Sequence, residues 1–143
     1  MQWIVRGLIV LVAALVAIQL VPVERANPPV ESDIATPDEV KRILRHSCYD
    51  CHSNETIWPW YARVAPMSWL IARDVKEGRR ELNFSEWNKF TGGRRARKFK
   101  EIVEQVEQEK MPQWYYIVLH PDAKLPAADK ATILKWAKQG LAS

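Results

Sequence analysis

The feature that most constrains this chain is a short motif at residues 48–52, which reads Cys-Tyr-Asp-Cys-His. It contains both cysteines of the chain, and His52 directly follows the second one. Two thiols at this spacing on a helical turn can each add to one vinyl group of a single haem, and the next histidine can bind the iron. The motif therefore predicts one haem c attached through Cys48 and Cys51, with His52 as an axial ligand.

Three other interpretations of the cysteine pair are a zinc site, a redox-active dithiol and a disulfide. Structural zinc needs four ligands, usually with a second pair at similar spacing, and His46 and His120 form no such pair. A redox-active C-x-x-C is typical of a βαβ unit, and no strand pattern is visible. A disulfide across two intervening residues would be strained and would leave His52 unexplained. The motif favours haem over all three.

The first 23 residues predict a membrane anchor. They are apolar from residue 7 onwards apart from Gln19 and Pro22. Counted from Trp3, the segment is about long enough to cross the ~30 Å hydrocarbon core as a helix. It exceeds the ~7–15 residues of a signal-peptide core, and no A-x-A cleavage site directly follows it. Arg6 on the short flank favours export of the rest of the chain.

We therefore expect a single-pass helix in the cytoplasmic membrane, with the C-terminal domain in the periplasm. The alternative, a cleaved export signal, would place the domain on the same side. Residues 24–35 contain two prolines and polar side chains without periodicity, which predicts a flexible tether. Residues 36–143 would then form the haem-binding domain. The formal net charge of +4 is too small to indicate a nucleic-acid partner.

The domain shows helical periodicity and no alternating strand pattern. Thr36, Pro37 and Glu39 match a capping box and predict a helix that leads to Cys48. The clearest periodicity lies at residues 94–110, where four apolar side chains share one face: Phe99, Ile102, Val103 and Val106. Further helices are expected at about residues 68–78, at Ser85, and from Pro126 to Gly140. These patterns predict an all-α bundle of four or five short helices.

Three stretches of the domain, residues 48–61, 65–87 and 110–125, together resemble a small family of membrane-tethered, single-haem domains related to the cytochromes c. The resemblance extends over about residues 36–140. It implies a cytochrome-c-like helical fold around one covalent haem and a proximal histidine at His52, but no substrate. The family pattern has a methionine before a proline, which matches Met111. Pro126 departs from the usual capping serine, which bears only on where the last helix begins.

Met111 is the expected second axial ligand. It precedes Pro112 in a loop after the clearest helix, and a soft thioether suits haem iron and favours its reduced state. His120, Met67 and an open coordination site are the alternatives. His46 lies on the helix that leads to Cys48, so we do not expect it to reach the opposite haem face.

Trp58 and Trp60 follow the motif closely, so we expect them to line the haem pocket and exclude water. The alternative is that they belong to the ordinary core. The basic run at residues 94–100 is most simply the solvated face of a helix. The alternative is a docking patch for an acidic redox partner or for anionic headgroups.

These expectations favour an electron carrier over an enzyme, with one-electron transfer through a haem ligated by His52 and Met111. A haem-based redox or gas sensor, or a weak peroxidase, would instead need an open or displaceable sixth ligand. A third alternative is a haem that only stabilises the fold. No nucleophile–base pair or phosphate-binding loop is recognisable, and the oligomeric state stays open.

Overall fold

The computed structural model describes residues 1–142, and within these residues it contains seven α-helices and no β-strand. The helices are α1 (Gln2–Ala17), α2 (Asp38–Ser47), α3 (Tyr49–His52), α4 (Met67–Glu81), α5 (Gly93–Glu107), α6 (Trp114–Leu119) and α7 (Ala127–Leu141). Four short 3₁₀ segments join them: η1 (Ile18–Leu20), η2 (Trp60–Arg63), η3 (Trp87–Lys89) and η4 (Pro121–Ala123). The predicted all-α fold is confirmed.

The domain has six α-helices after α1, rather than the expected four or five. The additional ones are α3 and α6, which are only four and six residues long. A helix of one or two turns is too short to show an apolar period, so its sequence does not distinguish it from a loop.

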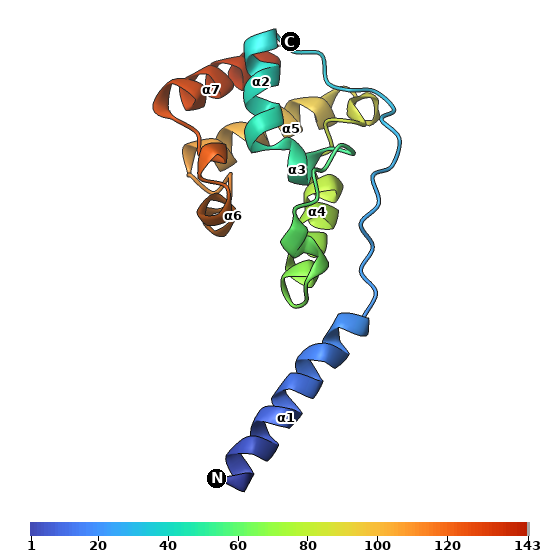
Figure 1. Ribbon diagram of the computed structural model, residues 1–143. Coiled ribbons are helices and arrows are strands. Elements are labelled where there is room, and N and C mark those ends of the chain that lie inside the picture. The colour runs from blue at the N-terminus through green and yellow to red at the C-terminus, as the bar shows by residue number, and fades with distance from the viewer. Residues whose placement is uncertain (143) are drawn as a thin grey trace.

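Helix α1 stands away from the domain, and none of its residues is buried (Figure 1). Together with η1 it forms a continuous helical segment from Gln2 to Leu20 that is long and apolar enough to cross a membrane. A signal sequence at an N-terminus meets the same criteria of length and composition.

The segment expected to be a flexible tether runs extended along the domain surface and is fastened to it (Figure 1). The side chain of Asn54 donates a hydrogen bond of 2.8 Å to the carbonyl of Pro29. Ser32 pairs with Glu86 in an isolated β-bridge. Ile34 is only 2% exposed and belongs to the core. Residues 24–35 are therefore part of the folded domain surface rather than a free linker.

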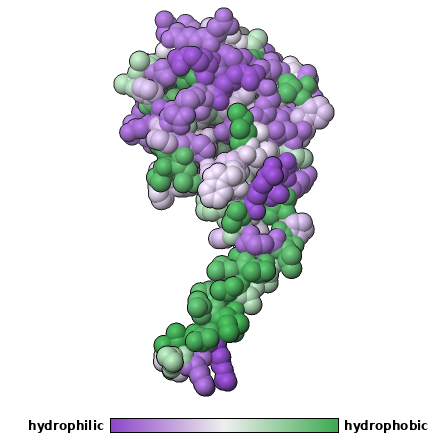
Figure 2. Space-filling view, in the orientation of Figure 1, coloured by the Kyte–Doolittle hydropathy of each residue, from purple (hydrophilic) through white to green (hydrophobic). Residues whose placement is uncertain are grey.

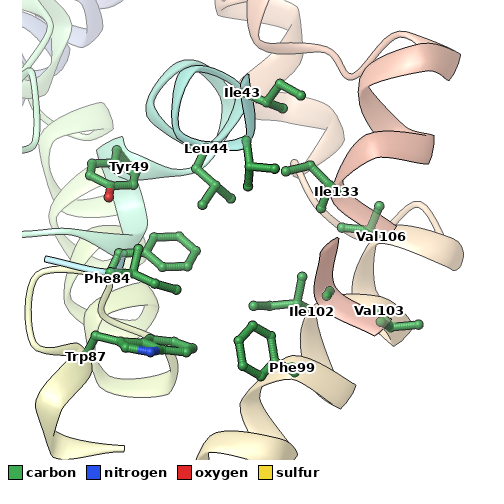
Figure 3. Close-up of a cluster of buried hydrophobic side chains, with 13 residues drawn as sticks. Ile43, Leu44, Tyr49, Phe84, Trp87, Phe99, Ile102, Val103, Val106 and Ile133 are labelled. Atoms are coloured by element: carbon green, nitrogen blue, oxygen red, sulfur yellow. The ribbon is translucent and has the colours of Figure 1, made fainter. Parts of the chain in front are cut away.

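The core is formed mainly where α5 and α2 pack on α7, with Phe84 and Trp87 from the loop after α4 (Figure 3). The predicted apolar face of α5 is confirmed, since all four of its side chains are buried: Phe99, Ile102, Val103 and Val106. Gly140 allows the close approach of α7 to α5, because a Cβ atom there would lie 2.5 Å from the Phe99 ring.

The start of α2 differs from the sequence prediction. Pro37 is the N-cap residue, with an extended ψ of 147°, and its carbonyl accepts the first helical hydrogen bond from Lys41. Thr36 makes no capping bond, and its buried hydroxyl oxygen has no hydrogen-bond partner. The predicted capping box therefore does not form. Asp38 and Glu39 instead place negative charge in the first turn, where it favours the helix dipole.

Candidate functional site

The Cys-x-x-Cys-His motif forms a separate helical turn directly after α2. Cys48 interrupts the helix with φ −129° and ψ −34°, and α3 then begins at Tyr49. The carbonyl of Cys48 accepts hydrogen bonds from the backbone N–H groups of Cys51 and His52, at 3.2 and 2.9 Å. This turn brings both cysteines to the wall of one small cavity of about 30 Å³. Their spacing along one turn is the arrangement that attachment to a single haem needs.

The orientation of His52 is fixed by the backbone of α4 and the residue after it. Its Nδ1 lies 3.0 Å from the carbonyl oxygen of Gly78 and 3.0 Å from that of Leu82. Carbonyl oxygens only accept hydrogen bonds, so Nδ1 must carry the proton and donate it to them. Burial lowers the pKa of His52, which keeps the ring neutral. Nε2 is therefore the unprotonated nitrogen that can bind a metal ion.

Gly78 permits this arrangement because α4 passes very close to the motif. A Cβ atom at position 78 would lie 2.4 Å from the carbonyl oxygen of Cys51. Only a glycine can occupy this place without a shift of one backbone against the other. Sequence reasoning missed Gly78, because a helical glycine does not by itself reveal what packs against it.

His52 and Met111 line the same cavity, which has a volume of about 290 Å³. Cys48 lies in its wall as well. The other walls are largely apolar and come from α2, α5, α7 and the loop after α4: Leu44, Phe84, Ile102, Val106 and Ile133 (Figure 3). The two side chains that the sequence singled out as axial ligands are thus brought together across 58 intervening positions of the chain, inside a largely apolar pocket.

The turn that ends α5 places Met111 at this cavity. Glu109 has a positive φ of 56°, which reverses the chain after the helix. The backbone N–H groups of Lys110 and Met111 then both donate to the carbonyl of Gln105, at 2.9 and 3.3 Å. This closure folds Met111 back over the last turn of α5, and Gln105 itself lines the cavity.

Met67 and His120 lie together in a second cavity of about 330 Å³, which Cys51 also lines but His52 does not. Nε2 of His120 is 3.0 Å from the hydroxyl of Tyr61, and its ring stacks on Tyr116 at 4.2 Å between ring centres. His46 is exposed, with its Nε2 3.7 Å from a carboxylate oxygen of Asp122. None of these three alternatives shares a cavity with His52.

The surroundings of the two thiols disfavour the alternative chemistries. Burial raises the pKa of Cys48 to about 12, and burial together with the charge of Asp50 raises the pKa of Cys51 to about 12. A redox-active dithiol needs the opposite shift, toward the thiolate. Among the described residues there is no group of three or more His, Cys, Asp or Glu side chains that could hold a metal ion. The donor set therefore fits haem, with one nitrogen and one thioether ligand, better than zinc.

The two residues between the cysteines connect the motif to distant parts of the chain. The hydroxyl of Tyr49 donates a 2.5 Å hydrogen bond to Asp33. Asp50 accepts a 2.7 Å hydrogen bond from the hydroxyl of Tyr116 on α6 and a 2.9 Å bond from the N–H of Ile57. The motif is thus braced on both sides. Sequence analysis assigned no role to these residues, because their partners lie far away in the sequence.

Trp58 and Trp60 lie outside the cavity that His52 and Met111 share. The indole of Trp58 donates to the side chain of Asn27 at 3.3 Å, so it packs with the extended segment before α2. Trp60 is 77% exposed and makes an edge contact with Tyr61. The apolar lining comes instead from aliphatic residues and Phe84.

A helical domain arranged around a C-x-x-C-H turn, with a methionine in the same apolar cavity, defines a class of haem-carrying protein. The sequence model of the haem-binding domain family matches residues 13–139, most of the chain. The chain belongs to this family of haem-binding domains. Comparisons with curated proteins and with solved structures gave no match.

Proposed function

We propose that this protein is a monohaem c-type cytochrome, tethered to the membrane on the exported side and acting in one-electron transfer. Cys48 and Cys51 would hold the haem covalently, and His52 and Met111 would be its axial ligands. The observation that carries the proposal is the shared cavity of His52 and Met111, with Nδ1 of the histidine held by two carbonyl oxygens.

Bound haem c would supply an iron centre that accepts and releases one electron. The chain's own contribution is to keep the ligands fixed while the charge changes. The carbonyls of Gly78 and Leu82 hold the imidazole ring in one orientation and one tautomer. The thioether of Met111 favours the reduced state, and the apolar walls exclude water, which also disfavours the extra positive charge of the oxidised state.

The basic residues at the start of α5 support a protein partner with an acidic surface. Arg94 and Arg97 are exposed on the first turns of this helix. Lys98 and Lys100, in contrast, are paired with Glu101 and Glu104, at 2.6 and 3.6 Å. We infer that the arginines are the part of the run that is available to attract a partner, mainly by raising the encounter rate.

The first test is a carbon monoxide difference spectrum of the full chain, made together with haem-attachment machinery and reduced with dithionite. Little or slow binding of carbon monoxide is expected, because both axial positions would be filled. Fast and complete binding would contradict the ligation by Met111 and would favour a sensor or a peroxidase. The control is the double variant Cys48→Ala/Cys51→Ala, which should carry no haem after denaturing electrophoresis. Haem that survives denaturation in this variant would refute covalent attachment through the two cysteines.

A further inference from the structure

The end of the domain that faces α1 carries a set of exposed apolar side chains, here called the apolar rim: Ile57, Trp60, Val64, Trp69, Trp114, Val118 and Leu119. The most prominent members are 79% (Ile57), 77% (Trp60) and 76% (Trp114) exposed. Single exposed apolar residues are ordinary, but a group of this size on one face marks a surface that contacts something else.

Two segments that are distant in the sequence form the rim. They are joined by the hydrogen bond between Tyr61 and His120. Both also line the 330 Å³ cavity, which Ile57 borders on one side and Trp114 and Val118 border on the other. Part of the rim therefore lines a largely apolar cavity that also has Cys51 in its wall.

The exposed charged side chains within the two rim segments are arginines, whereas the nearby carboxylates Asp50 and Asp74 lie in the cavity wall and accept hydrogen bonds from Tyr116 and Tyr115. Residues 57–73 and 111–120, which supply all of the rim, include no aspartate or glutamate. They do include Arg63 and Arg73, which are both exposed. Other surfaces of the domain are mixed, as on α5, where glutamates follow the basic run. An apolar surface whose own segments carry exposed arginines suits a layer of phosphate groups above hydrocarbon.

The rim is also fastened to the end of the apolar helix. The side chain of Gln19 accepts a 2.9 Å hydrogen bond from the N–H of Ala65 and donates a 3.2 Å bond to its carbonyl. Arg25 donates to the carbonyl of Ala62 at 3.2 Å. These contacts hold the loop at residues 60–66 next to the point where the helix ends (Figure 1). The end of the domain next to α1 shows green and pale residues mixed with purple ones, whereas the opposite end is mainly hydrophilic (Figure 2).

We propose that the apolar rim is a second membrane contact, with Trp60 and Trp114 in the headgroup layer of the leaflet at which α1 ends. This inference rests on the membrane anchor of the proposed function. Tryptophan prefers this layer because its ring is apolar and its N–H is polar. Arg63 would lie beside the lipid phosphates. The contact holds the domain in one orientation, with the Cys51 side of the haem site toward the bilayer.

The test uses the full haem-loaded chain in lipid nanodiscs that contain a photoactivatable lipid with its reactive group near the glycerol. Mass spectrometry then locates the lipid adducts. We expect adducts on residues 1–20 and also on residues 57–64 or 114–119. Adducts confined to residues 1–20 would overturn the rim contact while leaving the anchor intact. The absence of adducts throughout the chain would overturn the anchor and the rim contact together.

Matched variants separate lipid contact from random collision with the nanodisc surface. Trp60→Ser/Trp114→Ser should lose most rim adducts and keep those on α1, and Trp60→Phe/Trp114→Phe should retain a larger share. The haem spectrum should be the same in both variants, because both residues lie outside the cavity of His52 and Met111. Unchanged rim labelling in the serine variant would refute the proposal.

Discussion

At the scale of single residues, the site depends on how two side chains are held relative to each other. His52 is positioned by backbone carbonyls of another segment, and Met111 by a turn that closes on Gln105. Neither depends on a flexible surface contact. A rigid pair of ligands is what the proposed one-electron transfer requires, because ligand movement would slow the change between oxidation states.

The first prediction concerns Met111→Ala. Loss of the thioether should lower the reduction potential by on the order of 100 mV and open a coordination site to carbon monoxide. Potentiometric titration and the carbon monoxide difference spectrum measure both effects. Met67→Ala is the matched control, since Met67 lies in the other cavity, and it should leave ligation unchanged. The opposite result, with Met67→Ala opening the iron site, would identify Met67 as the ligand.

The second prediction concerns Gly78→Ala. The added Cβ atom would overlap the carbonyl of Cys51, so α4 or the motif must shift. We expect a loss of about 1–3 kcal/mol in the free energy of unfolding, together with an altered haem spectrum as His52 loses its fixed orientation. Gly93→Ala is the control, because no atom lies within 4 Å of the corresponding Cβ position. Equal stability and spectra for the two variants would contradict the close approach.

The sequence was sufficient to propose the four principal residues of the site, which are Cys48, Cys51, His52 and Met111. Each was recognisable from its side-chain type and from its place relative to the motif or to a proline. The sequence could not reveal Gly78 and Leu82, whose contribution is a backbone carbonyl from 26 and 30 positions away. Nor could it show that Trp58 and Trp60 point elsewhere. Both tryptophans are close to the motif in the sequence, but they do not line the cavity of His52 and Met111. After His52, the next residue that lines this cavity is Glu81.

At the scale of elements, Arg79 on α4 ties three segments together. Its guanidinium donates to the carbonyls of Ser53 and Ala26 and to the side chains of Asn27 and Thr56, at 2.7 to 2.8 Å. These bonds join α4, the loop after the motif, and the extended segment before α2. The sequence predicted that this segment is a flexible tether, because it is polar and contains two prolines. Such a composition does not reveal which side chains donate hydrogen bonds to its backbone carbonyls.

The third prediction follows from this contact. Arg79→Ala should lower the free energy of unfolding by roughly 2 kcal/mol and release the extended segment. Denaturant titration measures the first effect. Faster amide hydrogen exchange at Glu31, Ser32 and Ile34, whose N–H groups bond to the carbonyls of Ser85 and Phe84, measures the second. The neighbouring Arg80→Ala is the control, because Arg80 is exposed and pairs with the nearby Glu77 and Glu81. A change within about 0.5 kcal/mol is expected. Similar effects for Arg79→Ala and Arg80→Ala would contradict the proposed role of Arg79 in joining the three segments.

The fourth prediction concerns pH and the link between Asp33 and the motif. Burial favours a higher pKa for Asp33, but hydrogen bonds from Lys41 and Tyr49 outweigh it and hold the pKa below 3.8. A lowered pKa stabilises the fold above pH 3.8, and this contribution is lost as the pH falls further. Asp33→Asn should therefore be less stable than the wild type near neutral pH. The difference should shrink in acid, and a constant difference at all pH values would contradict the ionic contribution.

At the scale of the whole molecule, an apolar helix, an extended segment and a haem-binding domain follow one another in the sequence. The sequence indicated this order because each part has a different composition. It could not show that Gln19 binds the loop at Ala65, since one amide side chain among apolar residues gives no sign of its partner. The domain is consequently held close to the end of the helix instead of ranging freely.

The last prediction is that haem attachment requires export through this helix. Covalent attachment of haem c takes place beyond the cytoplasmic membrane, and Arg6 on the short N-terminal flank favours a cytoplasmic N-terminus. A C-terminal alkaline phosphatase fusion should therefore be active, whereas a β-galactosidase fusion should not. Deletion of residues 2–23 should abolish covalent haem, and replacing these residues with an unrelated cleavable export signal should restore it. Covalent haem in the deletion variant, retained in the cytoplasm, would contradict both the orientation and the route.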